Sequence, residues 1–142
     1  MNPGSIHLYD DEIRRIHRTK GLIGLIFYEP ILAGKKGLFR SQEKWIELFV
    51  EPIQRTVRAV YDTGVANQHA VWDCLCIGSD FDGQLNPTDK FATSDQFPAL
   101  KKFLKGALHE DRFHPYRNAS EADALADQIC FGNVVAFPKR SF

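Results

Sequence analysis

Two aspartates and a glycine follow a short apolar segment in the middle of the chain. The segment is residues 71–76, VWDCLC, and Asp80, Asp82 and Gly83 come shortly after it. A short apolar run bounded by a turn is typical of a buried parallel strand. In α/β folds the chemistry lies at the carboxyl ends of such strands. The spacing indicates carboxylates at a site, although a solvated Asp-x-Asp-Gly turn that merely ends a strand has the same pattern.

A second apolar run is expected to form the neighbouring strand. It covers residues 22–28, LIGLIFY, and Glu29-Pro30 ends it, since proline cannot continue an interior strand. A helix capped by Asp10 is expected over 10–17, before this run. Between the two strands we expect a long helix that begins after Ser41 and ends at Gly64, with a kink or break at Pro52. The order helix, strand, helix, strand predicts parallel pairing with a right-handed crossover.

The last third of the chain reads as helices. A helix is expected from about Phe97 to Ala107, and Ser120 can cap another. Residues 129–138 are ambiguous between a strand and a broken helix. A loop is expected over 109–117, and it contains a cluster of potential metal ligands: His109, Glu110, Asp111 and His114. We interpret this cluster as solvated rather than metal-binding, because the residues lack a regular spacing.

Composition limits the class of protein. The chain has 142 residues, so we expect one domain over 1–142. Its 18 basic and 18 acidic residues give no net charge, which argues against nucleic acid or an anionic membrane as the main partner. No apolar run reaches the roughly 20 residues of a membrane span, and no signal peptide is visible, so we expect a cytoplasmic location. Three cysteines suggest reduced thiols, with a metal role for Cys74 and Cys76 as the less favoured alternative.

The expected strands are too few for a complete parallel sheet. Parallel sheets are covered on both faces and rarely consist of two strands. The sequence therefore suggests that the chain is the end of a longer protein, or that it completes its sheet with another chain. Residues 31–40 form an expected loop on the same side as Asp80, and its Lys35 and Lys36 read as solvated rather than as a substrate clamp.

The motifs resemble one known family. Residues 78–83, GSDFDG, are similar to the signature of the membrane dipeptidase group (renal dipeptidase, peptidase family M19). Residues 10–25 resemble the helix and seventh strand of those enzymes, and Phe27-Tyr28 resembles the aromatic pair at that strand's end. Residues 120–137 resemble the closing helix with its Gly-Asn break. The resemblance covers nearly the whole chain but only the last part of the family.

The resemblance implies a fold and a chemistry. That family is a (β/α)8 TIM barrel with a two-zinc centre, so the chain would be an α/β protein supplying strands seven and eight plus the closing helices. Asp80 would be the zinc ligand that handles the proton of the metal-bound water. Tyr28, Asp82 and Gly83 would contact a dipeptide or a related small amide. The family's other zinc ligands are absent here, so the isolated chain should be inactive.

Two departures from the family leave other functions open. The family has an arginine for the substrate carboxylate where this chain reads Ser5-Ile6-His7, and another after the Gly-Asn break where it reads 134–136, VVA. The first hypothesis is therefore the C-terminal fragment of a zinc-dependent dipeptidase-like hydrolase, which needs the missing N-terminal strands or self-association. The alternative is a non-catalytic self-associating or interaction domain derived from that fold.

Overall fold

The structure is a computed structural model that describes residues 8–26, 42–65, 68–79, 91 and 93–141. Two short strands lie among helices of different lengths. The strands are β1, Ile23–Leu25, and β2, Leu75–Ile77. The helices are α1 (Asp10–Arg18), α3 (Gln42–Tyr61), α4 (Phe97–Leu108), α5 (Ala122–Asp127) and α6 (Asn133–Ser141), and the tighter or wider turns are η2 (Gln68–Trp72), η3 (Ser94–Gln96), η4 (Asp111–Tyr116), η5 (Ala119–Glu121) and the π-helical η6 (Gln128–Gly132).

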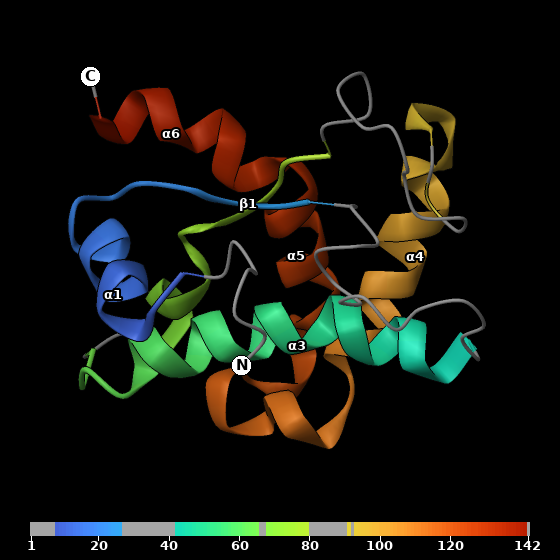
Figure 1. Cartoon of the computed structure of the whole chain (residues 1–142), viewed down its shortest axis with the longest axis horizontal. Coiled ribbons are helices and arrows are strands. Elements are labelled where there is room, and N and C mark those ends of the chain that lie inside the picture. The colour runs from blue at the N-terminus through green and yellow to red at the C-terminus, as the bar shows by residue number, and fades with distance from the viewer. Residues whose placement is uncertain (1–7, 27–41, 66–67, 80–90, 92, 142) are drawn as a thin grey trace.

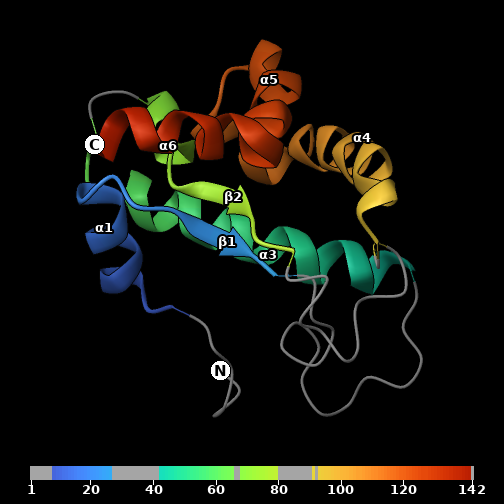
Figure 2. The same cartoon turned by 90° about the horizontal axis from the view of Figure 1, so that it is seen from above.

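The two strands pair in parallel, as the order of elements predicts. Ile23 lies opposite Leu75, and Leu25 lies opposite Ile77. Figure 1 shows α3 running below β1, and Figure 2 shows the strands over α3, with α6 on the side of β2 that faces away from β1. The prediction that residues 22–27 and 75–79 contain adjacent parallel strands is confirmed for these six positions.

The expected part of a (β/α)8 barrel is wrong for the described chain. Its residues are mostly helical, and their sheet has two strands of three residues each. The barrel was implied by the resemblance, and the apolar helix stripes suggested that a larger sheet was missing. These stripes pack on one another instead: α4 contacts α5, and α1 contacts α3. Buried side chains from both regions, such as Ile53, Leu104 and Leu125, belong to one hydrophobic cluster.

The apolar segment 71–76 differs from its expected structure, and the ambiguous tail 129–138 adopts one of its two alternatives. The run 71–76 is not one strand, because Val71 and Trp72 end the 3-10 turn η2 and β2 begins only at Leu75. Trp72 is fully buried there, and its Nε1 donates a hydrogen bond to the Tyr116 carbonyl at 2.8 Å. The ambiguous tail is a broken helix, with the wide turn η6 leading into α6 at the Gly-Asn step. Apolar content alone did not distinguish these elements from strands.

Helix ends account for the remaining corrections. Tyr9, not Asp10, precedes α1, and its backbone N–H donates to Glu12 Oε2 at 2.7 Å. Asn118 rather than Ser120 begins the turn before α5, and its N–H donates to Glu121 Oε2 at 3.0 Å. The long helix continues through Pro52 without a break. It ends at Tyr61, before the predicted Gly64. Gly64 closes the turn that follows, at φ +74°, where glycine has no steric penalty.

Candidate functional site

The two strands end side by side, shortly before the two predicted site segments in the sequence. Leu25 and Ile77, the last residues of β1 and β2, are register partners. Tyr28 and Asp80 each come three residues later in the sequence. Tyr28, Asp80, Asp82 and Gly83 themselves lie outside the described residues, as do Lys35 and Lys36. Their mutual geometry therefore stays a prediction. The structure supplies the two paired strands that precede them, which we call the platform.

Two glycines bring the strand backbones together at this edge. A Cβ on Gly24 would lie 3.2 Å from the Gly78 Cα, and a Cβ on Gly78 would lie 3.1 Å from the Gly24 Cα. Both separations are closer than an ordinary van der Waals contact, so a side chain at either position would push the strands apart. Gly78 also donates its N–H to the Leu25 carbonyl at 3.0 Å. The first residue of the GSDFDG motif is thus needed for the packing of the platform.

A buried amide fixes the start of β2. Asn133 is 2% exposed, and its Nδ2 donates to the carbonyls of Trp72 and Leu75, both at 2.7 Å. Its Oδ1 accepts a hydrogen bond from Gln128 Nε2 at 3.1 Å, and the same Nε2 donates to Asp73 Oδ1 at 2.9 Å. The Gly-Asn break between η6 and α6 therefore attaches the last helix to the strand that leads to Asp80.

The described residues do not supply a metal centre. Within 8–26, 42–65, 68–79, 91 and 93–141, no three His, Cys, Asp or Glu side chains come together as a ligand set. His109 Nε2 lies 3.4 Å from Asp123 Oδ1, and His114 Nε2 lies 3.7 Å from Asp111 Oδ1. All four side chains are exposed by more than half. The expected loop 109–117 is instead mostly the turn η4, in which Phe113 and Tyr116 are buried.

The cysteines next to the platform are buried thiols. Cys74 and Cys76 are both buried, and Cys76 Sγ lies 3.6 Å from the Ile23 carbonyl, to which it donates a weak hydrogen bond. Burial raises the pKa of the Cys76 thiol. A raised pKa disfavours the thiolate, which is the form that binds zinc or attacks a carbonyl. Their surroundings therefore fit a structural role.

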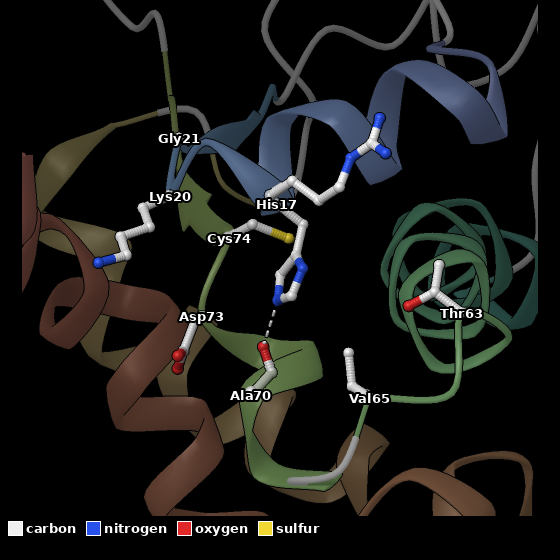
Figure 3. Close-up of a pocket in the computed structure, with 9 residues that line it drawn as sticks. His17, Lys20, Gly21, Thr63, Val65, Ala70, Asp73 and Cys74 are labelled. Carbon is white, nitrogen blue, oxygen red and sulfur yellow. Dashed lines mark hydrogen bonds between the residues drawn. The ribbon is translucent and has the colours of Figure 1, made fainter.

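A cavity that the sequence did not reveal lies at the opposite end of the strands. It has a volume of about 370 Å³ and is lined by residues that include His17, Lys20, Thr63, Asp73 and Cys74. Figure 3 shows the His17 ring reaching across it, with Nε2 3.0 Å from the Ala70 carbonyl. Cys74 directly precedes β2, so the cavity is at the amino end of the sheet. It cannot be the site expected beyond the carboxyl ends.

Only basic residues near the end of α1 could have pointed to this cavity. Bases at a helix C-terminus are already explained by the helix dipole, so that signal is not specific.

Comparison with known proteins adds no relationship. No protein family, characterised protein or solved structure matches the chain. The resemblance to the dipeptidase group therefore rests on the motifs quoted above.

Among the described helices, none combines the length and the apolar character that crossing a bilayer requires.

Proposed function

We propose that the chain is part of a zinc-dependent, dipeptidase-like hydrolase that cleaves dipeptides or related small amides, with Asp80 as the residue that carries its chemistry. One observation supports this most directly. The strands β1 and β2 are parallel and in register, so the segments leading to Tyr28 and Asp80 leave the same edge of the sheet. The GSDFDG motif begins at Gly78, whose contact with Gly24 brings β2 against β1.

Each residue has a proposed role in this reaction. The Asp80 carboxylate holds the attacking water and accepts its proton, a task that requires an acceptor within hydrogen-bond reach. Tyr28, Asp82 and Gly83 contact the substrate, and Asp82 also shapes the turn beyond Asp80. The buried Asn133 keeps the start of β2 in place and so positions Asp80 indirectly.

Zinc does not fit the described residues alone. They hold no cluster of three or more ligands, whereas catalytic zinc sites use three protein ligands plus water. The proposal therefore requires ligands from further strands or from a second chain. The chain alone, supplied with zinc, should not hydrolyse dipeptides. Turnover by the isolated chain would contradict this requirement.

The decisive experiment compares two isosteric substitutions in the assembly that supplies the remaining ligands. Asp80→Asn should keep the fold and lose about 10²–10⁴-fold in turnover, because an amide cannot accept the water's proton. It should also lower the bound zinc. Asp82→Asn is the matched control and should cost less, since a turn residue acts through backbone hydrogen bonds. Turnover and zinc content are measured for both variants beside the parent. Near-parental turnover of Asp80→Asn would overturn the assignment.

A second candidate function is a non-catalytic, self-associating domain. It is favoured by apolar side chains at the surface of α6 and its preceding turn, where Phe131, Val134 and Val135 are 53%, 45% and 62% exposed. A complete assembly that turns over no dipeptide, while the chain forms a defined oligomer, would favour this function over the hydrolase.

A further inference from the structure

The cavity at the amino end of the strands has opposite charges on its lining. Arg18 and Lys20 are basic, and Asp73 is acidic. Figure 3 shows Lys20 and Asp73 on the side of the cavity opposite Thr63 and Val65. Among the ion pairs of the described residues, none involves Lys20. Opposite charges that do not pair with each other are complementary to a ligand that carries both charges.

The position of Lys20 is an unfavourable one for a lysine. Its backbone has a φ of 59°, a conformation that glycine adopts without penalty. The carbonyls of Ile16 and His17 at the end of α1 already accept hydrogen bonds from the N–H groups of Gly21 and Lys20, so the Lys20 ammonium is not needed to cap the helix. Strained residues of this kind cluster at ligand-binding positions. The conformation therefore points to a role for the Lys20 side chain at the cavity.

The Asp73 carboxylate is held in place by its neighbours. Its Oδ1 accepts a hydrogen bond from Gln128 Nε2 at 2.9 Å, and its backbone N–H donates to the Ala70 carbonyl at 3.2 Å. An ionised carboxylate has about four acceptor positions, so the bond to Gln128 does not prevent it from accepting from a ligand. A carboxylate that is fixed before binding loses less conformational freedom when a ligand arrives.

The remaining walls of the cavity are largely apolar. Val65 and Ala70 are half-buried there, and Cys74 is buried. A carbonyl only accepts, so His17 Nε2 carries a hydrogen and donates it to Ala70, which fixes the ring across the cavity. The volume of about 370 Å³ is at the lower end of the range for small-molecule sites, roughly 300–1,000 Å³. These walls suit a small ligand with a short apolar part.

We infer that this cavity binds a small zwitterion with a short apolar side chain, such as a free aliphatic amino acid. The ligand carboxylate pairs with Lys20, its ammonium pairs with Asp73, and its side chain packs against Val65, Ala70 and Cys74. The cavity is at the end of the strands opposite to the one that leads to Asp80. The inference therefore does not depend on the proposed hydrolase.

The first test compares leucine with two analogues that each lack one charge. Isocaproate is leucine without its ammonium, and isopentylamine is leucine without its carboxylate. In an NMR titration of the chain, leucine should bind with a Kd of about 0.1–1 mM, and each analogue should bind at least about tenfold more weakly. The amide signals of Gly21, Val65 and Cys74 should move, whereas that of Lys102, on the distant face of α4, should not.

The second test assigns each charge of the ligand to its residue. Lys20→Gln should weaken leucine and isocaproate at least about fivefold and leave isopentylamine unchanged. Asp73→Asn, whose amide oxygen can still accept from Gln128, should weaken leucine and isopentylamine and leave isocaproate unchanged. Lys102→Gln is the matched control, since it removes the same charge from an exposed position of α4 and should alter no affinity.

A further variant separates lost binding from lost folding. Lys20→Gly should weaken leucine as much as Lys20→Gln does, yet raise the urea midpoint, because glycine tolerates the left-handed backbone. Unfolding then cannot explain the weaker binding. Any of three results would overturn the inference: no movement of the cavity amides up to about 50 mM leucine, far above the expected Kd; parental leucine affinity in Lys20→Gln; or an analogue that binds as tightly as leucine.

Discussion

Lys20 adopts a backbone conformation that favours glycine. Its φ is 59°, and it follows the end of α1. The Lys20 N–H donates to the His17 carbonyl at 3.0 Å, and the Gly21 N–H donates to the Ile16 carbonyl at 2.9 Å. These two bonds form a Schellman motif, in which the left-handed position is usually glycine. In this chain the glycine comes one residue later, and a Cβ there would lie 3.0 Å from the Ile16 side chain.

Replacing Lys20 should therefore change stability in a predictable direction. Lys20→Gly removes the left-handed penalty of about 1–2 kcal/mol, partly offset by the greater freedom of glycine in the unfolded chain. We expect a net gain of about 0.5–1 kcal/mol in the free energy of unfolding. Lys20→Ala is the control, since it removes the charge but keeps the Cβ. Urea denaturation measures both, and an equal gain from Lys20→Ala would mean that charge, not φ, is responsible.

The thiols give a second prediction at the residue scale. Burial raises the pKa of Cys130 to about 11, and the nearby Lys101 only partly opposes this shift. A thiol with a pKa two units above its usual value has about 100-fold less thiolate at pH 8. Iodoacetamide should therefore alkylate Cys130 of the folded chain about 100-fold more slowly than a free cysteine. Its rate should still rise about tenfold per pH unit up to pH 10. A rate that levels off near pH 9 would contradict the raised pKa.

Which residue caps a helix was harder to predict than the helix itself. The sequence offers Asp10 and Asp11 near the start of α1, and Asn118 and Ser120 before α5, all acceptable capping types. The structure places the caps one residue earlier, at Tyr9, and two residues earlier, at Asn118, where their N–H groups donate to Glu12 and Glu121. A backbone hydrogen bond from Asn118 lowers the pKa of Glu121. Local sequence contains the right residue types, but the backbone angles that select among them come from packing.

At the scale of elements, Asn133 joins the last helix to the sheet. Its Nδ2 donates to two carbonyls on η2 and β2, which are inside the protein and have no access to water at that point. Asn133→Leu would leave the Trp72 and Leu75 carbonyls without this donor. Each buried polar group left unsatisfied costs about 1–3 kcal/mol. We expect a loss of about 2–4 kcal/mol in the free energy of unfolding.

Two variants serve as controls for this prediction. Asn133→Asp keeps the shape but faces the two carbonyls with oxygens, so it should be at least as destabilising as Asn133→Leu at pH 7. Val134→Ala changes the next residue, which is 45% exposed, and should cost less than about 0.5 kcal/mol. Chemical denaturation of all three is the measurement. A tolerated Asn133→Asp would show that the amide donor is not what matters.

Element type was predictable where the hydrophobic period was long. The stripe Phe97, Leu100 and Leu104 predicted α4 nearly to its ends. The prediction for segment 71–76 failed because a short, mostly apolar segment fits a strand or a turn of helix equally well. Trp72 decides the outcome: its indole N–H reaches the Tyr116 carbonyl, which is distant in sequence. A contact over 44 residues leaves no local signal.

At the scale of the whole molecule, helix–helix packing takes the place of the expected sheet. Lys105 Nζ lies 2.9 Å from Asp123 Oδ2, and Lys101 Nζ lies 2.6 Å from Asp127 Oδ1, so two ion pairs join α4 to α5. These side chains are partly exposed, and pairs of this kind add little stability. The apolar contacts beneath them matter more, since Leu100, Leu104 and Leu125 are at most 1% exposed. The sequence showed the apolar stripes but not which surfaces they would meet.

The protein has one hydrophobic cluster, with residues from α1, α3, β2, α4 and α5. A single cluster predicts that the chain unfolds cooperatively. Leu104 is fully buried in α4, and Trp72 reports on the sheet side, where its ring lies 5.8 Å from that of Phe113. Leu104→Ala should lower the free energy of unfolding by about 2–5 kcal/mol. Because the cluster is continuous, Trp72 fluorescence and helical circular dichroism should shift to the same lower urea midpoint.

The two signals must report on different parts of the chain for this comparison to work. The chain has two tryptophans, so a Trp45→Phe background leaves Trp72 as the fluorescent probe. Lys102→Ala, at an exposed position of the same helix, is the control and should change the free energy of unfolding by less than about 0.5 kcal/mol. All variants are compared at one protein concentration, since association would raise the midpoint. If Leu104→Ala lowered only the circular dichroism midpoint, α4 and α5 would unfold separately from the sheet, and the cluster would not be one cooperative core.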